Sequence, residues 1–240
     1  MLLLVVRKNF RAYPAFTFYI VVNLVQAILL FIIYRQSGFS STSAWLFAFG
    51  TQTVAIGARA LAVAEICRHL LSRYPGIWGL AKRILLICAG LVLLYSGLAA
   101  RHQWKLAVPS ADRGLELSIA TVIVVLFLFV RYYDVRTERA DRWLATGFCI
   151  YSCFGALNDT IADRYLYGYS ELWSLLGMLA FFASLFLWSW ALWEARTETA
   201  TEENLLPLGV YQSFAPQINL RLRMLNDQLY KIWKPEVPRN

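Results

Sequence analysis

The fold is decided by the stretch Gln52-Thr-Val-Ala-Ile-Gly-Ala-Arg59-Ala-Leu-Ala-Val-Ala-Glu65-Ile-Cys-Arg68-His69. It is apolar over most of the length of a membrane-spanning helix, yet it carries an arginine near its middle and a Glu-x-x-Arg-His cluster at one end. A charged side chain inside a bilayer is costly, and it normally faces the interior of a bundle, where other helices supply its partners. The stretch therefore predicts one helix packed among several others in a membrane.

The composition agrees with a membrane protein. Of the 240 residues, 59% are hydrophobic and 16% are charged, against about 45–50% and about 25% in soluble domains. The apolar residues gather in runs long enough to cross a hydrocarbon core of about 30 Å, which takes about 20 helical residues. We expect an all-α polytopic membrane bundle of six transmembrane helices, near residues 15–34, 44–70, 84–100, 115–130, 143–161 and 172–192.

The chain divides into two parts, a transmembrane bundle over residues 1–196 and a cytoplasmic segment over residues 197–240. In the second part a polar linker precedes an amphipathic helix, whose apolar residues follow the i, i+4, i+7 spacing of one helical face. Lysines and arginines surround that face, which is typical of a helix lying in the headgroup region. The apolar face consists of Ile218, Leu222, Leu225, Leu229, Ile232 and Trp233.

The lysines and arginines predict the orientation. With six spans, most of the 23 basic residues fall on one side of the membrane, and cytoplasmic loops carry such an excess. We therefore expect both termini in the cytoplasm and the protein in the plasma (inner) membrane of a bacterium. The net charge of +8 is explained by these loops, and no basic patch with interleaved aromatics indicates a nucleic-acid partner. Trp188, Trp190 and Trp193 are interpreted as an interfacial aromatic belt.

Arg59 is the first candidate for a functional role. At about 1.5 Å per residue it lies roughly 13 Å outward from Arg68, close to mid-bilayer, and its side chain leans toward the outer, N-terminal end of its helix. We expect it to face the bundle interior and to contact Asp159, the carboxylate judged to be within reach. Three interpretations stay open: a structural network, a site for an anionic ligand or conduction path, or a contact with a partner subunit. The expected intramembrane polar network is Asn23, Gln26, Gln52, Arg59, Asn158 and Asp159.

A second cluster, formed by Glu65, Arg68 and His69, lies at the inner end of the same span. These residues are three and four positions apart, so they lie on neighbouring helical faces. We interpret the cluster as an interfacial ion pair at a solvated helix end. The sharper alternative is a cytoplasmic switch, or a docking point for the amphipathic tail.

The remaining acidic residues are assigned to the outer side. Asp112 is expected in the turn that precedes the fourth span, and Glu116 near the start of that span. Two interpretations stay open for this region, solvated helix ends or a small polar vestibule. Its members are Glu116, Asp159, Asp163, Glu171, Arg101, His102 and Arg113.

Patterns of catalysis and metal binding are absent from the sequence. It contains no Gly-x-Ser-x-Gly elbow, His-Glu-x-x-His pair or phosphate loop. His69 and His102 are expected on opposite sides of the membrane, and Cys149 and Cys153, which share a helical face, have no histidine nearby. We therefore expect no enzyme activity, no metal and no cofactor.

Three short motifs carry a resemblance: Tyr13-Pro-x-Phe-x-x-Tyr19, Glu65-x-x-Arg-His and Arg73-Tyr-Pro-Gly. In these the chain resembles an uncharacterised group of bacterial multi-pass membrane proteins. Its layout is also loosely similar to the seven-helix membrane modules at the N-terminus of some bacterial sensor kinases. The resemblance implies seven helices, with residues 1–6 as the remnant of the first, although no kinase or other output domain follows. From the residues alone, an interfacial anchor is the other interpretation of residues 1–6.

Two hypotheses of function follow. The first is a non-enzymatic sensor or accessory membrane protein, which passes an event in or outside the membrane to a cytoplasmic protein partner through the tail. The alternative is a small-solute transporter or channel, forming a homo-oligomer, with Arg59 as an anion-accepting group. Against the alternative, no span contains the glycine and proline interruptions that mark a substrate site in transporters.

Overall fold

The computed structural model describes residues 9–37, 41–71, 74–102, 107–132, 137–158, 170–194 and 224–232. These residues are helical apart from short connections, and none of them lies in a strand. A short helical segment covers residues 224–232. The other elements are η1 (Asn9–Arg11), α2 (Pro14–Ser37), α3 (Thr42–Leu70), α4 (Pro75–His102), α5 (Ala107–Tyr132), α6 (Arg139–Leu157) and α8 (Ser170–Glu194).

Five of the described helices are long and apolar enough to cross a membrane, which confirms the prediction of a multi-pass helical membrane protein. They correspond to the first four expected spans and the last one. Helix α6, expected as the fifth span over residues 143–161, is not among the five, because its first turns carry Arg139, Asp141 and Arg142. The five segments are Pro14–Gln36, Ala44–Leu70, Gly76–Arg101, Ala107–Tyr132 and Leu175–Trp193.

Two helices begin well before the expected spans. Helix α4 starts at Pro75, since proline suits the first position of a helix, where its missing N–H is not needed. Helix α5 starts at Ala107 and holds Pro109 in its first turn, where proline is tolerated for the same reason. Asp112, expected in a turn, therefore lies inside α5. This difference decides the composition of the candidate site.

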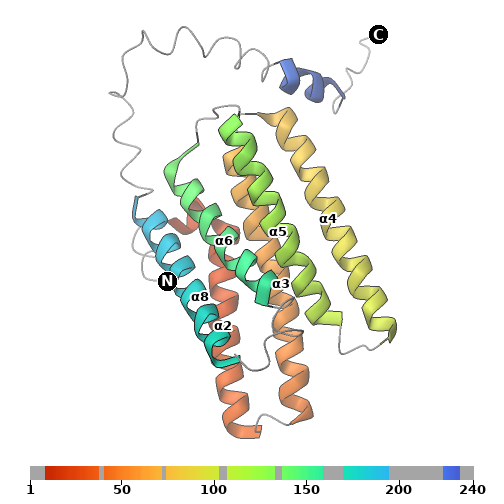
Figure 1. Cartoon of the computed structure of the whole chain (residues 1–240), viewed down its shortest axis with the longest axis vertical. Helices are drawn as coiled ribbons and strands as arrows, with labels where there is room; N and C mark the ends of the chain where they lie inside the picture. Colours follow the sequence, from red (N-terminus) through yellow and green to blue (C-terminus); the bar gives the residue numbers. More distant parts are fainter. Residues whose placement is uncertain are drawn as a thin grey trace.

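Helix α3 is the central element of the bundle. It contacts α2, α4, α5 and α6, whereas α4 packs mainly along α5 at one edge and α8 packs along α6 (Figure 1). Ala55, Ala58 and Ala62 of α3 are almost completely buried. Small residues let helices approach closely in a membrane, where helix association depends on packing rather than on expulsion of water. The alanines of α3 therefore explain its central position.

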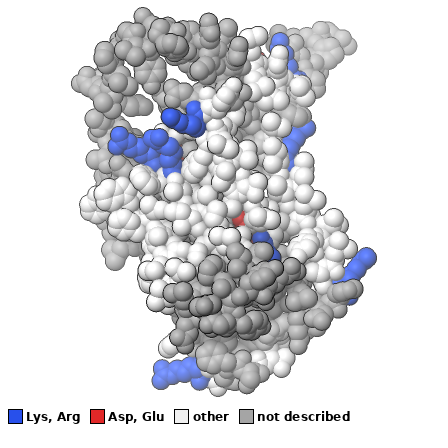
Figure 2. All heavy atoms as spheres, viewed as in Figure 1, with Lys and Arg blue, Asp and Glu red and all other residues white. Residues whose placement is uncertain are grey.

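The outer surface of the bundle is apolar, as expected for contact with lipid. Large side chains such as Phe31, Leu93 and Phe186 are more than 60% exposed. On the face in Figure 2, the described residues are mostly uncharged; a small acidic spot lies close to a basic group near the middle, and the other basic side chains lie toward the ends and edges. Exposed apolar area of this extent is typical of a membrane-facing surface.

An aromatic cluster fills the space between α2, α6 and α8. Phe16 and Tyr19 of α2, Phe148 of α6 and Trp188 of α8 are buried, and their ring centroids lie 4.8–6.5 Å apart. The Trp188 indole N–H donates to the Leu144 carbonyl oxygen at 3.2 Å. The assignment of Trp188 to an interfacial belt is therefore wrong, because it lies in the core, which a tryptophan can enter when its N–H finds an acceptor.

Candidate functional site

The centre of the candidate site is Arg59, which lies in the middle of α3 and is 2% exposed. Its Nη1 lies 3.1 Å from Asp112 Oδ1 and 3.1 Å from Glu116 Oε1. The two carboxylates are four residues apart on α5, so they project from one face of that helix. The Asp112 side chain is 20% exposed and that of Glu116 is 8% exposed. One guanidinium thus joins α3 to α5 inside the bundle.

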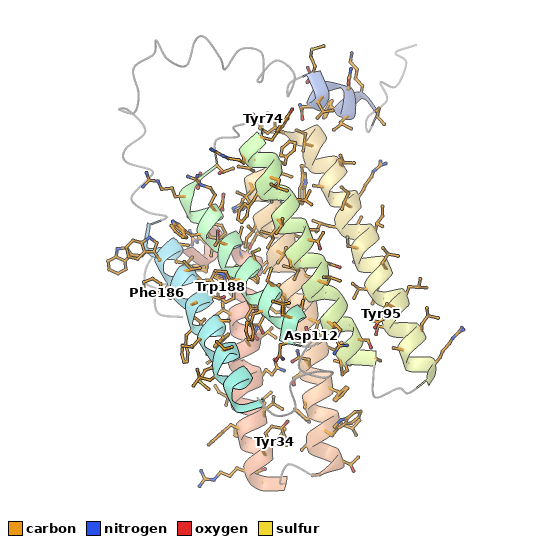
Figure 3. The ribbon with its side chains drawn as sticks, in the orientation of Figure 1. Tyr34, Tyr74, Tyr95, Asp112, Phe186 and Trp188 are labelled. Carbon is orange, nitrogen blue, oxygen red and sulfur yellow. The ribbon has the colours of Figure 1, made fainter. Side chains whose placement is uncertain are left out.

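Two amides extend this network to α2. Gln52 Nε2 donates to Asp112 Oδ2 at 2.7 Å, and Gln26 Nε2 donates to Gln52 Oε1 at 2.8 Å. Asp112 therefore accepts from both Gln52 and Arg59, through its two oxygens. Figure 3 labels Asp112 where α3, α5 and the end of α6 come together. The polar groups form a continuous chain from α2 through α3 to α5.

Helix α6 completes the surroundings of Arg59. The Tyr151 ring centroid lies 5.0 Å from Arg59 Cζ, within the range of a cation–π interaction. One turn further on, a Cβ added at Gly155 would overlap the Glu116 carboxylate. Glycine at position 155 therefore makes room for the second carboxylate of the site.

The structure brings together three of the six residues expected in the network, namely Gln26, Gln52 and Arg59. Asn23 instead donates to the Tyr19 carbonyl oxygen of its own helix at 2.8 Å. Asn158 lies at the C-cap of α6, and Asp159 lies outside the described residues. The view that Asp159 was the one carboxylate within reach of Arg59 is wrong, because Asp112 and Glu116 occupy that position.

The two carboxylates were missed because the start of α5 was placed at Leu115, with Asp112 in a turn and Glu116 in an outer vestibule. A signal was present in the sequence. Glu116 lies three and four residues from Ile119 and Ala120, and all three are buried on the same face of α5. Acidic residues on the apolar, inward face of a span predict a buried basic partner.

The charges in the site are unequal. Two carboxylates flank the single guanidinium of Arg59. An ionised carboxylate can only accept hydrogen bonds, so each of the two needs a donor such as Arg59. An anion at Nη1 of Arg59 would have to displace Asp112 or Glu116, whereas Arg59 Nε is buried and has no hydrogen-bond partner among the described residues. Two carboxylates against one guanidinium favour a structural charge network over an anion site, because a further anion is repelled by both.

A second polar junction lies at the end of the bundle where α3 ends and α4 begins, called here the α3–α4 end. The Glu65 carboxylate accepts from the backbone N–H groups of Ala15 and Phe16 at 3.1 and 2.9 Å. Glu65 thus caps the first turn of α2, where the helix dipole also favours a negative charge. Its assignment to an ion pair with Arg68 or His69 on its own helix is wrong, and Arg68 is exposed.

Asp141 of α6 is the other acceptor at this junction. The Tyr13 hydroxyl donates to Asp141 Oδ1 at 2.8 Å, and His69 Nδ1 lies 3.5 Å from the same oxygen. Burial raises the pKa of the Tyr13 phenol above its usual range, and the Asp141 carboxylate adds to this shift. Tyr13 therefore stays protonated and donates. Together with Glu65, Asp141 ties the start of α2, the end of α3 and the start of α6.

We expect Glu65→Ala to lower the free energy of unfolding by about 0.5–2 kcal/mol, the usual cost of losing a helix cap. Thermal unfolding in detergent measures the change. Glu138→Ala is the matched control, because Glu138 is exposed at the N-cap of α6 and makes no side-chain cap bond. Equal losses in the two variants would contradict the capping role of Glu65.

A third contact joins the tail to the bundle. Asn226 Oδ1 accepts from the backbone N–H of Gly76, in the first turn of α4, at 2.8 Å. A Cβ at Gly76 would overlap the backbone carbonyl of Asn226, so the close approach requires glycine. Leu229, one turn further along the tail, packs against the buried core. The sequence did not reveal this contact, because it joins residues 150 positions apart.

Comparison with known proteins does not narrow the class further. No family model, curated protein or solved structure matches the chain. Cys149 Sγ and Cys153 Sγ lie 3.9 Å apart, and across the described residues no group of three or more metal-ligating side chains occurs. The fold and the site define a multi-pass α-helical membrane protein with a charged network inside its bundle.

Proposed function

We propose that the protein is a six-span bacterial inner-membrane protein with both termini in the cytoplasm, acting as a non-enzymatic sensor or accessory subunit. An event at the Arg59 network would be passed to a cytoplasmic protein partner through residues 197–240. The observation that carries this proposal is the contact of Asn226 with Gly76, which attaches the tail to a helix of the bundle.

The six-span topology counts α6 as the fifth span. Its 19 residues extend roughly 28 Å at about 1.5 Å per residue, close to the hydrocarbon thickness. Its charged first turns fall at the α3–α4 end, where Asp141 is paired with Tyr13 and His69. With α6 included, the positive-inside rule assigns the α3–α4 end to the cytoplasm.

A series of contacts supports communication between the network and the tail. Arg59 of α3 is joined to α5 through Asp112 and Glu116. Helix α5 is the main neighbour of α4, and the first turn of α4 holds Asn226. A change of charge at Arg59 would alter how α5 lies against α3, and α4 would follow because its packing depends on α5.

The alternative, a small-solute transporter or channel in which Arg59 accepts an anion, has less support. Arg59 Nη1 already donates to two carboxylates, and the aromatic cluster of Phe16, Phe148 and Trp188 fills the space between α2, α6 and α8. Solute flux into liposomes that is abolished by Arg59→Ala would favour the alternative over the proposal.

Gly76→Ala tests the role of the tail. Its Cβ would overlap the Asn226 carbonyl, so the tail should detach from α4. Losing one hydrogen bond of about 1 kcal/mol predicts roughly fivefold faster hydrogen exchange over residues 224–232. A photo-crosslinker at exposed Gln228 should form an adduct with a cytoplasmic protein in cells. In the Gly76→Ala variant this adduct should disappear or change in yield.

Gly97→Ala is the control, because it lies on the same helix and its added Cβ would meet no atom within 4 Å. The proposal is supported when Gly76→Ala alters both exchange and crosslinking while Gly97→Ala alters neither. It is overturned when Gln228 of the unmodified chain forms adducts with no other protein, or when the two glycine variants behave alike.

A further inference from the structure

The α3–α4 end of the bundle is strongly basic. Glu138 and Asp227 are exposed acidic residues there, whereas Glu65 and Asp141 are engaged in the junction with α2. Exposed basic side chains come from five separate helical segments. They include Arg68 of α3, Lys82 and Arg83 of α4, Arg131 of α5, Arg142 of α6 and Lys231 of the tail.

The position of the tail relative to the bilayer follows from α4. The apolar run between Arg83 and Arg101 is about 17 residues, or roughly 26 Å at 1.5 Å per residue, close to the hydrocarbon thickness of about 30 Å. Lys82 and Arg83 therefore lie at the hydrocarbon edge. Gly76, about two turns further out, lies in the headgroup layer. The tail segment lies against the start of α4 (Figure 1), so it occupies the same layer.

Docking of the tail places Lys231 in this layer, together with Asp227 of the same segment. Asn226 and Leu229 contact the bundle, and Lys231 follows two residues after Leu229. Lys231 is thus held at the same end as Lys82 and Arg83. In a headgroup layer the available anion is a lipid phosphate, to which clustered lysines and arginines are attracted.

We propose that Lys82, Arg83 and Lys231 bind the headgroup of an anionic phospholipid, and that this lipid holds the tail docked on the start of α4. The inference rests on the proposed role of the tail, and it names the ligand that controls it. Asp227 is the exposed acidic residue of the tail segment, and Asn226 Nδ2 lies 3.5 Å from its Oδ1. Lys231 is exposed, and it is the basic residue within residues 224–232 of the tail.

The test compares hydrogen exchange of residues 224–232 in nanodiscs of phosphatidylcholine and of an equal mixture with phosphatidylglycerol. The anionic lipid should slow exchange about tenfold or more, since each lysine or arginine near such a surface gains roughly a factor of five in affinity. The triple variant Lys82→Gln, Arg83→Gln, Lys231→Gln should lose this difference. The conservative exchange Lys82→Arg, Arg83→Lys, Lys231→Arg should retain it, which separates loss of charge from misfolding.

Arg35→Gln with Arg101→Gln is the matched control, because both arginines are exposed at the opposite end of the bundle. The proposal is overturned when phosphatidylglycerol leaves exchange unchanged, when the control loses the effect equally, or when inorganic phosphate alone reproduces it in phosphatidylcholine. A lipid effect on exchange without a protein adduct at Gln228 supports this inference and overturns the proposed function. An adduct at Gln228 that depends on Gly76 but not on lipid supports the proposed function and overturns this inference.

Discussion

Replacing Arg59 with glutamine should lower the free energy of unfolding by about 3–5 kcal/mol, the usual cost of removing one partner of a buried charge network. Asp112 and Glu116 would lose the guanidinium that lies 3.1 Å from each of them, and two carboxylates would remain in the bundle without it. Thermal unfolding in detergent, followed by the reaction of a thiol dye with buried Cys67, measures the change.

The control for this prediction is Arg68→Gln, which removes the same group from an exposed position on the same helix and should change stability little. Adding Glu116→Gln to Arg59→Gln should recover part of the loss, because the two side chains interact directly. Losses that simply add in the double variant would contradict a shared network, as would equal losses in the two arginine variants.

The second large effect is expected at Gly147 of α6. A Cβ at this position would overlap the Trp188 indole, and Trp188 would have to leave its place against Phe16 and Phe148. Overpacking of a core typically costs about 1–3 kcal/mol. We therefore expect Gly147→Ala to destabilise the protein, although alanine favours helix formation.

Gly90→Ala in α4 should have the opposite sign. Its Cβ would meet no atom within 4 Å, so the change leaves packing intact and adds the helix preference of alanine, about 0.5–1 kcal/mol. Thermal unfolding of the two variants in the same detergent compares them. A stabilised Gly147→Ala variant would show that Trp188 does not lie against α6 as described.

The class of protein and the approximate positions of the spans could be predicted from the sequence, because both depend on local properties. Length and hydropathy predicted a multi-pass helical protein, and the break at Pro75 was found from the conformational limits of proline. The expected start of α5 was wrong, because residues 107–114 combine a proline with small and polar residues, a composition that is also typical of a turn. Trp188 was misassigned for a related reason, since an aromatic residue near a helix end suits an interface or a core equally.

For the candidate site, the interior position of Arg59 followed from its depth in the span and from the cost of a charge in lipid. Its burial in the structure agrees with that expectation. Its partners did not follow, because the expected start of α5 at Leu115 put Asp112 in a turn and left Asp159 as the carboxylate judged to be within reach. The amides Gln26 and Gln52 were found because polar groups within an apolar run stand out.

By itself, the sequence determined that this protein is a bundle of apolar helices and that Arg59, near the middle of one span, faces the bundle interior. Hydropathy and the cost of an isolated charge in lipid are properties of a single helix, so they can be predicted from the sequence of that helix alone. Only the tertiary structure decided that Asp112 and Glu116 pair with Arg59, that Glu65 caps α2 and that Asn226 contacts Gly76. These contacts join separate helices, and their geometry depends on how the helices pack.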